Sequence, residues 1–341
     1  MGVCHSACQR VVSRQYSAMT HRLEIILPTA LDRGFDYLSP VALPAGTIVR
    51  VPLAGRSTLG VVWQEGQSHL PLSKYKSIEG VVESLPPLSG RMREFIRWVA
   101  WYNVAPLGAV LKMVLPGADA DQSGRKAVAD YVPPLDMSKL SLAPLRGLQA
   151  DVAGALRKHV QAGFSVSLLD GVTGSGKTEV YFDMIAAALA RDPQAQVLIL
   201  LPEIALSVQW LSRFESRFGV HPLVWNSTIT AAKRRVFFQA VASGQARVVV
   251  GARSALFLPY PCLSLVVVDE EHDTSYKQED GVIYHARDMA VARAQHEQFP
   301  VVLVSATPSL ETVQNSRAGK YQMFHLPQRH AEARLPRMEL V

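Results

Sequence analysis

The chain has 341 residues, enough for two or three domains. Its 48% hydrophobic and 19% charged residues exclude a disordered protein, and no apolar run approaches the roughly 20 residues of a membrane span, so no membrane partner is expected. The net charge of +6 favours polyanionic partners such as nucleic acid, although a modest excess of Lys and Arg also fits a solvated surface.

Residues 1–18 contain Arg10, Arg14, several serines and no acid. This composition superficially resembles an organellar targeting peptide. The alternative is a disordered extension or a mis-assigned start site, because the pattern of a folded protein begins at Met19.

The three cysteines of the chain are Cys4, Cys8 and Cys262. They are too few and too scattered for a disulfide framework, and they lack the paired spacings of a zinc site. We therefore expect a cytoplasmic protein and no zinc ligands in this chain.

Residues 19–115 predict a small, mostly β module with a helical tail. Short apolar runs alternate with turn residues in its first part, which is typical of strands. The runs are Leu23–Leu27, Thr47–Leu53, Leu59–Trp63 and Ile78–Val82.

The tail consists of two predicted helices, over Arg91–Tyr102 and Leu107–Val114. Apolar side chains recur at three- and four-residue steps in the first helix, at Phe95, Trp98, Val99 and Tyr102. We interpret these aromatic residues as core rather than as a base-stacking platform.

Residues 116–144 predict a linker, because proline and glycine pairs occur there with mixed charge and little periodicity. In residues 145–341 strands alternate with helices, the pattern of βαβ units and a parallel sheet. The predicted strands are Phe164–Leu169, Gln196–Leu201, Pro222–Trp225, Arg247–Val250, Leu263–Val268 and Val301–Ser305.

Residues 171–178 read Gly-Val-Thr-Gly-Ser-Gly-Lys-Thr and match the phosphate-binding pattern G-x-x-x-x-G-K-[ST] between a predicted strand and helix. The glycines let backbone N–H groups point at nucleotide phosphates, and the helix N-terminus adds its positive end. Lys177 places a charge on the γ-phosphate, and Thr178 is a ligand for Mg²⁺. The predicted nucleotide-binding residues here are Gly171, Thr173, Gly174, Ser175, Gly176, Lys177 and Thr178.

A second motif, Asp-Glu-Glu-His, follows the buried strand that begins at Leu263. Its acids emerge at the carboxyl edge of the sheet, where ligands bind in α/β folds. Asp269 would hold Mg²⁺, and Glu270 is suited to act as general base, so Lys177, Asp269 and Glu270 are the predicted catalytic residues. The alternative is a solvated acidic strand end.

Ser-Ala-Thr-Pro, at residues 305–308, ends another predicted strand at the same edge. Ser305 and Thr307 are predicted to sense the γ-phosphate and couple its loss to movement. A plain turn is the alternative.

Two further stretches carry polar groups suited to nucleic acid. Backbone and hydroxyl donors in residues 202–204 and 251–254, with Arg253 among them, suit contacts to phosphates. Aromatic residues, histidines and cations interleave in residues 272–287, a pattern that suits stacking with single strands, although a solvated loop has it too. The predicted contacts in this second stretch are Tyr276, Lys277, Tyr284 and Arg287.

Together these motifs resemble those of superfamily 2 helicases of the DEAD/DEAH type, and within them the PriA family of primosomal replication-restart helicases. The matching segments are residues 33–37, 44–52, 70–76, 171–181, 202–204, 251–257, 269–278, 284–288 and 305–311. The resemblance implies a small β module that binds a DNA 3′ end, followed by one RecA-like P-loop lobe with a parallel sheet.

The resemblance also implies a function. Members use ATP and Mg²⁺ to unwind DNA in the 3′ to 5′ direction during replication restart, on forks, single strands and 3′ ends. The implied partners are other primosome proteins and single-stranded-DNA-binding protein.

Carried over by position, the resemblance places a 3′-end pocket and a nucleotide contact on particular residues of this chain. The pocket falls on Phe35, Asp36, Tyr37, Gly46 and Lys76. Gln149 falls where the family has its adenine-reading glutamine.

The chain departs from the family pattern in two ways. Only the predicted linker occupies the place of the family's winged-helix domain, and the chain ends at Val341, before the second lobe and the zinc-binding region. We therefore expect an amino-terminal part with the first motor lobe.

Three functions remain open. The first is the ATP-binding part of a PriA-type helicase, and the second is a non-catalytic fragment that binds DNA and nucleotide without unwinding. The third, a P-loop kinase of small molecules, is disfavoured because nothing resembles an acceptor-binding lid.

Overall fold

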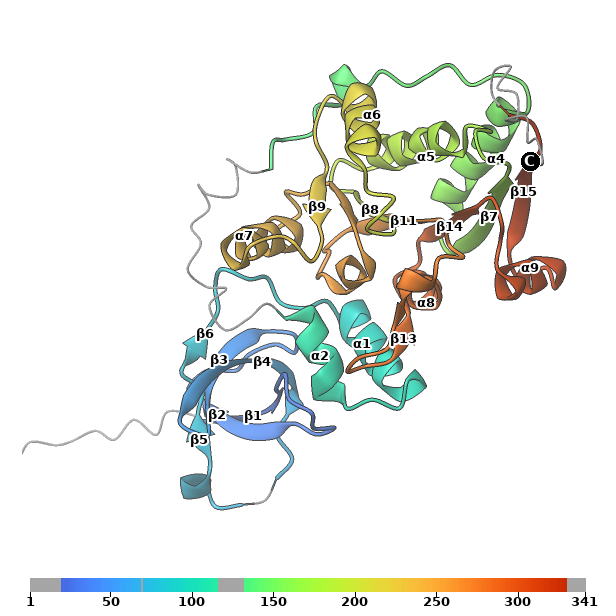
Figure 1. Cartoon of the computed structure of the whole chain (residues 1–341). Coiled ribbons are helices and arrows are strands. Elements are labelled where there is room, and N and C mark those ends of the chain that lie inside the picture. The colour runs from blue at the N-terminus through green and yellow to red at the C-terminus, as the bar shows by residue number, and fades with distance from the viewer. Residues whose placement is uncertain (1–19, 69, 116–131, 330–341) are drawn as a thin grey trace, which may run out of the picture.

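The computed structural model describes residues 20–68, 70–115 and 132–329, which form a small β module and a larger α/β domain (Figure 1). The predicted fold class is confirmed. The predicted amino-terminal extension, residues 1–18, and residues 116–131 of the predicted linker lie outside the described residues. No helix within the described ranges is long and apolar enough to cross a bilayer.

The β module is built on a six-stranded sheet in the order β5-β2-β1-β4-β3-β6. Its strands are β1 (His21–Ile26), β2 (Phe35–Ser39), β3 (Ile48–Leu53), β4 (Arg56–Glu65), β5 (Lys76–Ser77) and β6 (Gly80–Val81). Neighbours are antiparallel except β2 and β5. Ala54 and Gly55 join β3 to β4 with φ of 45° and 78°, as a two-residue hairpin turn requires.

Two helices, α1 (Gly90–Tyr102) and α2 (Leu107–Val114), join the β module to the α/β domain. Phe95 and Val99 of α1 are fully buried, as predicted. The Phe95 ring stacks on Phe257 of the α/β domain at a centroid separation of 5.9 Å. The two parts therefore share one apolar core instead of meeting through a solvated contact.

The last turn of α1 differs from the prediction. Tyr102 is 55% exposed and stacks on Trp98 at a centroid separation of 4.7 Å. The predicted core role is wrong for Tyr102, because this turn faces solvent, as its neighbour Trp101 also does at 75% exposure.

The α/β domain has a seven-stranded sheet in the order β15-β7-β14-β11-β8-β10-β9, and every neighbouring pair is parallel. Its strands are β7 (Ser165–Gly171), β8 (Gln196–Leu200), β9 (Leu223–Trp225), β10 (Val248–Gly251), β11 (Leu263–Asp269), β14 (Pro300–Ser305) and β15 (Gln322–Leu326). The six predicted strands are all present, with ends that differ by at most two residues. β15 was not predicted.

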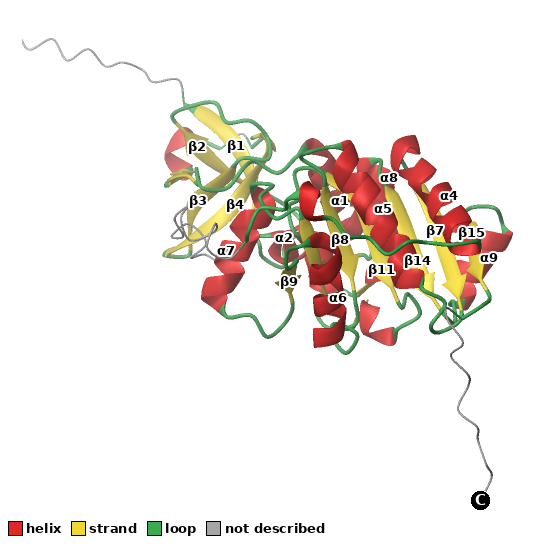
Figure 2. Ribbon diagram, turned by 90° about the horizontal axis from the view of Figure 1, so that it is seen from above, coloured by secondary structure: helices red, strands yellow, loops and turns green. Residues whose placement is uncertain are grey.

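Helices cover both faces of this sheet (Figure 2). They are α4 (Leu148–Ala162), α5 (Lys177–Arg191), α6 (Val208–Phe218), α7 (Ala231–Ala242), α8 (Ala286–Glu297) and α9 (Leu310–Arg317). Successive strand residues point to opposite faces. On β8, Val197 and Ile199 face α4, α5 and α6, whereas Leu198 and Leu200 face α7, α8 and the two helices of the β module.

Short elements complete the domain on the connections between strands and helices. They are η1 (Leu72–Lys74) in the β module, and η3 (Met137–Lys139), η4 (Arg253–Phe257), η5 (Thr274–Tyr276), β12 (Lys277–Gln278) and β13 (Tyr284–His285) in or beside the α/β domain. β12 and β13 form a small antiparallel hairpin after β11.

The described part of the predicted linker is packed rather than free. Leu135, Met137 and Leu140 lie against the core under α4, α5 and α6. Ser141 N donates to Arg217 O at 2.8 Å. This segment therefore belongs to the α/β domain, whose contacts begin before the predicted boundary at residue 145.

Candidate functional site

The phosphate loop connects β7 to α5. Gly174 and Gly176 have φ of 80° and 84°, a conformation that glycine adopts at little cost. A Cβ on Gly171 would lie 2.8 Å from Ser175 Oγ and 2.9 Å from Leu326 Cβ, so the start of the loop has no room for a side chain. The sequence thus forces the backbone to curl directly before the N-terminus of α5, where free N–H groups favour an anion.

Lys177 is held against this loop. Its Nζ donates to Gly171 O at 2.7 Å. Burial lowers the pKa of the Lys177 ammonium, while the carboxylates of Glu270, Asp269 and Asp170 oppose the shift. The ammonium therefore lies between the loop and the acids.

One cavity of about 390 Å³ joins the predicted residues at the carboxyl edge of the sheet. Among the predicted nucleotide-binding and catalytic residues, its lining includes Gln149, Thr173, Gly174, Ser175, Gly176, Lys177, Thr178, Asp269 and Glu270. The phosphate loop follows β7 and the acids follow β11, which lie on either side of β14 in the sheet.

Gln149 approaches the loop from α4. Its Nε2 donates to Ser175 O at 2.8 Å, so the amide of Gln149 bonds to the backbone of the phosphate loop. Sequence reasoning missed the opposite walls of the same cavity, which come from Ala143, Pro144, Leu145 and Arg213. Ala143 and Pro144 belong to the segment interpreted as a linker, whose mixed composition gave no signal, and Leu145 directly follows it.

Asp269 is buried at the end of β11. Its Oδ2 accepts from the Tyr181 hydroxyl at 2.9 Å, and Tyr181 accepts in turn from Trp210 Nε1 at 2.9 Å. Burial raises the pKa of Asp269 to about 6, the hydrogen bond from Tyr181 opposes the rise, and the neighbouring Glu270 adds to it. Tyr181 and Trp210, which the sequence did not single out, therefore fix the carboxylate.

Glu270 has φ of 49°, in the left-handed region that non-glycine residues seldom adopt. Such a conformation costs about 1–3 kcal/mol and persists only where surrounding contacts impose it. Here Glu270 N donates to Asp269 Oδ1 at 3.0 Å, and Asp273 N donates to Glu270 O at 2.8 Å. The turn directs the Glu270 side chain toward the cavity that Lys177 lines.

The Ser-Ala-Thr loop after β14 is attached to the acidic turn. The Ser305 hydroxyl lies 2.8 Å from His272 Nδ1, and Thr307 N donates to Ser305 Oγ at 3.0 Å. The predicted coupling residues Ser305 and Thr307 are thus linked by hydrogen bonds to His272, which lies two positions after the predicted catalytic residue Glu270.

The third acid of the motif, Glu271, is fully buried. Its Oε1 accepts from Ser309 N at 2.7 Å, and its Oε2 accepts from Arg287 Nη1 at 3.1 Å, Thr312 Oγ1 at 2.9 Å and the Ser309 hydroxyl at 3.0 Å. One carboxylate therefore joins the acidic turn to α8 and to the start of α9.

Three of the predicted DNA contacts are structural instead. Tyr276 is 1% exposed, and its hydroxyl donates to Leu200 O or Asp269 O. Tyr284 is 3% exposed against Phe257. Neither ring is open at the surface of the loop, so the predicted stacking role is wrong for both.

Arg287 is also buried, at 6% exposure. Its guanidinium pairs with Glu271 and, through Nε, with Asp288 Oδ1 at 2.9 Å. Arg287 is therefore occupied inside the protein, and the predicted contact to DNA is wrong for it as well.

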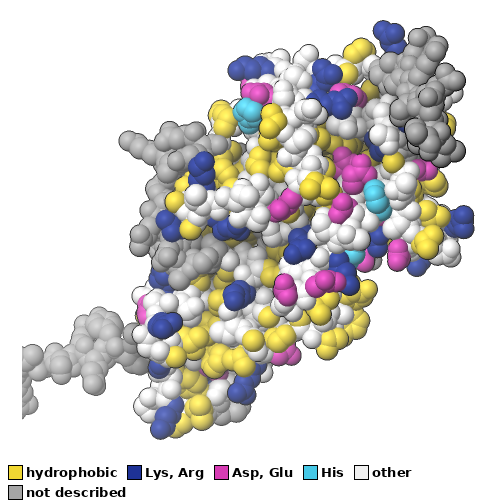
Figure 3. Space-filling view, viewed as in Figure 1, with side chains coloured by type: hydrophobic (Ala, Val, Ile, Leu, Met, Phe, Trp, Pro, Cys, Tyr) yellow, Lys and Arg dark blue, Asp and Glu magenta, His cyan; other side chains and the backbone are white. Residues whose placement is uncertain are grey.

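Arg253 and Lys277 remain at the surface. Arg253 Nη1 donates to Ser275 O at 3.0 Å and Lys277 O at 2.8 Å. Arg253 lines a groove of about 570 Å³ together with residues 202–204. On the face shown in Figure 3, basic side chains are spread over both parts of the molecule rather than gathered in one patch.

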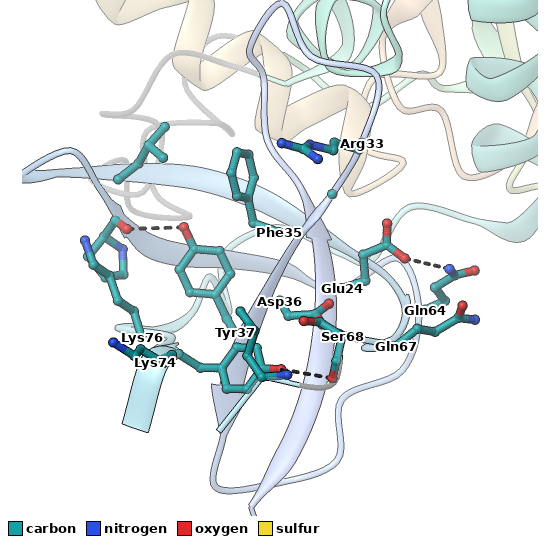
Figure 4. A pocket seen from close by; sticks show the side chains of 15 residues that line it. Glu24, Arg33, Phe35, Asp36, Tyr37, Gln64, Gln67, Ser68, Lys74 and Lys76 are labelled. Carbon is teal, nitrogen blue, oxygen red and sulfur yellow. Dashed lines mark hydrogen bonds between the residues drawn. The ribbon is translucent and has the colours of Figure 1, made fainter. Parts of the chain in front are cut away.

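A second cavity, of about 710 Å³, lies in the β module (Figure 4). Phe35, Asp36 and Tyr37 line it from β2, and Lys76 lines it from β5, which pairs with β2 at Tyr37. Asp36 Oδ2 accepts from Ser68 N at 2.8 Å. Sequence reasoning missed the polar residues that face them, which include Glu24, Arg33, Gln64, Lys74 and Tyr75.

Gly46 does not line this cavity. Its φ is 100°, and a Cβ there would lie 2.1 Å from Leu88 O. Its N–H donates to Val62 O and its carbonyl accepts from Leu88 N. Gly46 therefore permits close backbone packing beside the strands that carry the cavity, and its place in the 3′-end pocket stays a prediction.

No group of three or more His, Cys, Asp or Glu side chains in residues 20–68, 70–115 and 132–329 is placed to hold a metal ion. A cation beside Asp269 would therefore need ligands of another kind, such as a hydroxyl and phosphate oxygens.

Two sequence families match the two parts of the chain. Residues 24–116 match the family described as 3′DNA-binding domain (3′BD), and residues 149–316 match the DEAD/DEAH box helicase family. The α/β domain is thus a helicase domain of the DEAD/DEAH type, and the β module is a 3′DNA-binding domain.

Curated relatives match both parts at once. Replication restart protein PriA of Rickettsia conorii is 40% identical over 320 residues, which are 93% of this chain and 48% of that protein. The PriA protein of Haemophilus influenzae is 33% identical over 380 residues, 90% of this chain and 52% of that protein. The chain belongs to the PriA family, and it spans about half the length of these relatives.

Among solved structures, the chain is similar to the crystal structure of the DUF1998 helicase MrfA bound to DNA. The identity is 19% and the TM-score 0.37, over 52% of this chain and 25% of that chain.

Proposed function

We propose that this chain supplies the ATP-binding lobe and the 3′-end reader of a DNA helicase that unwinds in the 3′ to 5′ direction during replication restart. The observation that carries the proposal is the single cavity where Lys177, Thr178, Asp269 and Glu270 meet. This set combines a cation for phosphates, a hydroxyl and two carboxylates, the groups that phosphoryl transfer to water requires.

ATP fits this cavity with its phosphates over the glycine loop. The donor set also fits Mg²⁺, because a buried carboxyl whose pKa is raised beside a second carboxylate is stabilised in its ionised form by a cation. Thr178 and Asp269 would hold the ion, which neutralises phosphate charge when bound. Glu270 would accept a proton from the attacking water, and Lys177 would offset charge on the γ-phosphate.

The link between Ser305 and His272 supports a coupling role. A shift of the acidic turn on loss of the γ-phosphate moves His272, and with it the loop that carries Ser305 and Thr307. The groove beside Arg253 would hold one DNA strand by its phosphates, with residues 202–204 on its other wall.

The cavity of the β module would hold the terminal nucleotide of a DNA 3′ end. The Asp36 carboxylate can accept from a 3′-hydroxyl, Phe35 offers a ring to the base, and Lys74 and Lys76 add positive charge for the phosphates. By membership of the family, we propose that the complete protein acts in the cytoplasm with other primosome proteins and single-stranded-DNA-binding protein.

Asp36→Asn tests the 3′-end assignment. The unmodified chain is expected to bind a single strand with a 3′-hydroxyl more tightly than the same strand with a 3′-phosphate, which a carboxylate repels. Hydrogen bonds to charged groups contribute about 1.5–3 kcal/mol, so Asp36→Asn should remove about tenfold of this preference, measured by fluorescence anisotropy.

Glu65→Ala is the matched control, because it removes a carboxylate from the exposed end of β4, outside the cavity. Equal affinity of the unmodified chain for both strands would contradict the assignment.

A further inference from the structure

A third cavity lies where the β module's helices meet the α/β domain. It has a volume of about 400 Å³, at the small end of the roughly 300–1,000 Å³ of typical ligand sites. Its walls come from α2, α7, η4 and the end of β9. Neither the nucleotide site nor the 3′-end cavity shares a residue with it.

The lining of this cavity has an apolar interior and a cationic rim. Met113, Trp225 and Phe238 are among its apolar walls, and Lys112, Arg234 and Arg235 are its charged residues. No Asp or Glu is among the lining residues. A ligand that fits this pattern has a flat apolar part and a negative charge close to it.

Trp225 supports the same chemistry. It is 5% exposed, and its indole Nε1 has no hydrogen-bond partner among the described residues. The Arg234 guanidinium lies 4.9 Å from the centre of its ring, so one cation is already placed over an aromatic face. Trp225 therefore brings to the cavity wall an aromatic ring with a cation at its face and an indole N–H that has no partner among the described residues.

The cavity adjoins the groove beside Arg253. Arg234, Ser254 and Gln278 line both. Gln278 Nε2 also donates to Val282 O at 3.0 Å, which holds the dividing wall in place. The groove is lined by the acids Glu203 and Asp273 as well as by Arg234 and Arg253, whereas no acid lines the cavity beside it. A strand whose phosphates lie along the arginines of the groove would therefore pass an apolar cavity whose charged rim residues are all cations.

We propose that this cavity takes one unpaired nucleobase from the DNA strand in the groove, so that the strand is held by an inserted base as well as by its phosphates. This inference rests on the proposed strand-binding function of the groove. The apolar walls would contact the faces of the base, and the cationic rim would hold the phosphates on either side of it.

Ala231→Trp tests the inference by filling the mouth of the cavity. Ala231 is exposed at the start of α7 and lines the cavity, so a large side chain there blocks entry without disturbing the core. Ala232→Trp is the matched control, because Ala232 is also exposed but is not a lining residue. The probes are an oligothymidylate and a strand of the same length that keeps its 3′-terminal thymine and is abasic elsewhere, so that both present the same base to the 3′-end cavity.

Stacking of one base typically changes affinity by about tenfold. The unmodified chain should bind oligothymidylate about tenfold more tightly than the abasic strand, as measured by anisotropy. Ala231→Trp should bring this ratio close to one and leave the abasic affinity unchanged, while Ala232→Trp keeps the ratio. A ratio of one in the unmodified chain, or an unchanged ratio in Ala231→Trp, overturns the inference.

Arg253→Ala separates this outcome from failure of the proposed function. It should weaken both strands, because it removes a cation from the groove. If it weakens neither, the strand does not lie in the groove, and the proposed function fails at this point. If Arg253→Ala weakens the binding of both strands, and the unmodified chain binds the two strands equally, then the strand lies in the groove but no base enters the cavity. Binding of free thymidine monophosphate that is lost in Ala231→Trp, without any base dependence of the strand, would assign the cavity to a mononucleotide and also overturn the inference.

Discussion

Lys177→Ala is expected to lower DNA-stimulated ATP hydrolysis by at least about a hundredfold in the protein that carries this chain, since loss of one preorganised charge or donor at a transition state typically costs this much. Lys177 is the cation that lies between the phosphate loop and the two acids. Arg213 is the other cation among the described residues that line the cavity, and its pairing with Glu179 at 2.8 Å keeps it from replacing Lys177.

Two measurements check this prediction. Steady-state hydrolysis with and without single-stranded DNA gives the rate, and titration of this chain with a fluorescent ATP analogue gives the affinity, which should also fall. Lys158→Ala, on the exposed side of α4, removes the same charge outside the site and should change neither. A stimulated rate that survives Lys177→Ala would show that the phosphate loop has been assigned wrongly.

Glu271→Ala is expected to lower the free energy of unfolding by about 3–5 kcal/mol, the usual cost of leaving a buried charge without its partner. Glu271 is fully buried and accepts hydrogen bonds from Arg287, Ser309 and Thr312. Burial opposes the charge on Arg287, yet its pKa is raised because Asp288 and Glu271 lie beside it. Removing Glu271 therefore takes from Arg287 its buried carboxylate partner, leaving the half-exposed Asp288, and leaves the Ser309 and Thr312 donors without their acceptor.

Urea denaturation of the chain measures this loss. Glu271→Gln keeps the volume and one acceptor oxygen, so its loss should be smaller. Glu311→Ala is the control, because this carboxylate also lies 4.0 Å from Arg287 but is 72% exposed, and exposed pairs contribute about 0–1 kcal/mol. If Glu271→Ala and Glu311→Ala lose the same free energy, the buried network does not stabilise the fold as described.

The sequence predicted the phosphate loop and the acids of the site, but not the buried network around Glu271. The phosphate loop and the acids after β11 were predictable because their spacing and their place after buried strands follow from the chemistry of phosphate binding. The burial of Glu271 was not predictable, because the sequence Asp-Glu-Glu at residues 269–271 does not show which of the three carboxylates points into the core. Arg287, Tyr276 and Tyr284 were misassigned for the same reason: polar and aromatic residues in a loop look alike whether they face DNA or fill the core.

The central strands were predicted more completely than the edge strands. β8 and β11 are buried on both faces, so each appears in the sequence as a continuous apolar run. In β15 only Leu326 is buried, and β2 contains polar residues that face the cavity. Edge and site-bearing strands lose the apolar pattern by which strands are recognised, and the cavity of the β module was accordingly located by resemblance rather than by pattern.

The shared core under α1 and α2 fixes the distance between the cavity of the β module and the groove beside Arg253. Phe95 and Phe257 belong to different parts of the chain yet stack inside one core. The β module therefore has no hinge at this contact about which to swing while nucleotide is bound or released. If a 3′ end binds in the β module and the same strand binds in the groove beside Arg253, the length of DNA between the two sites would be fixed by the fold.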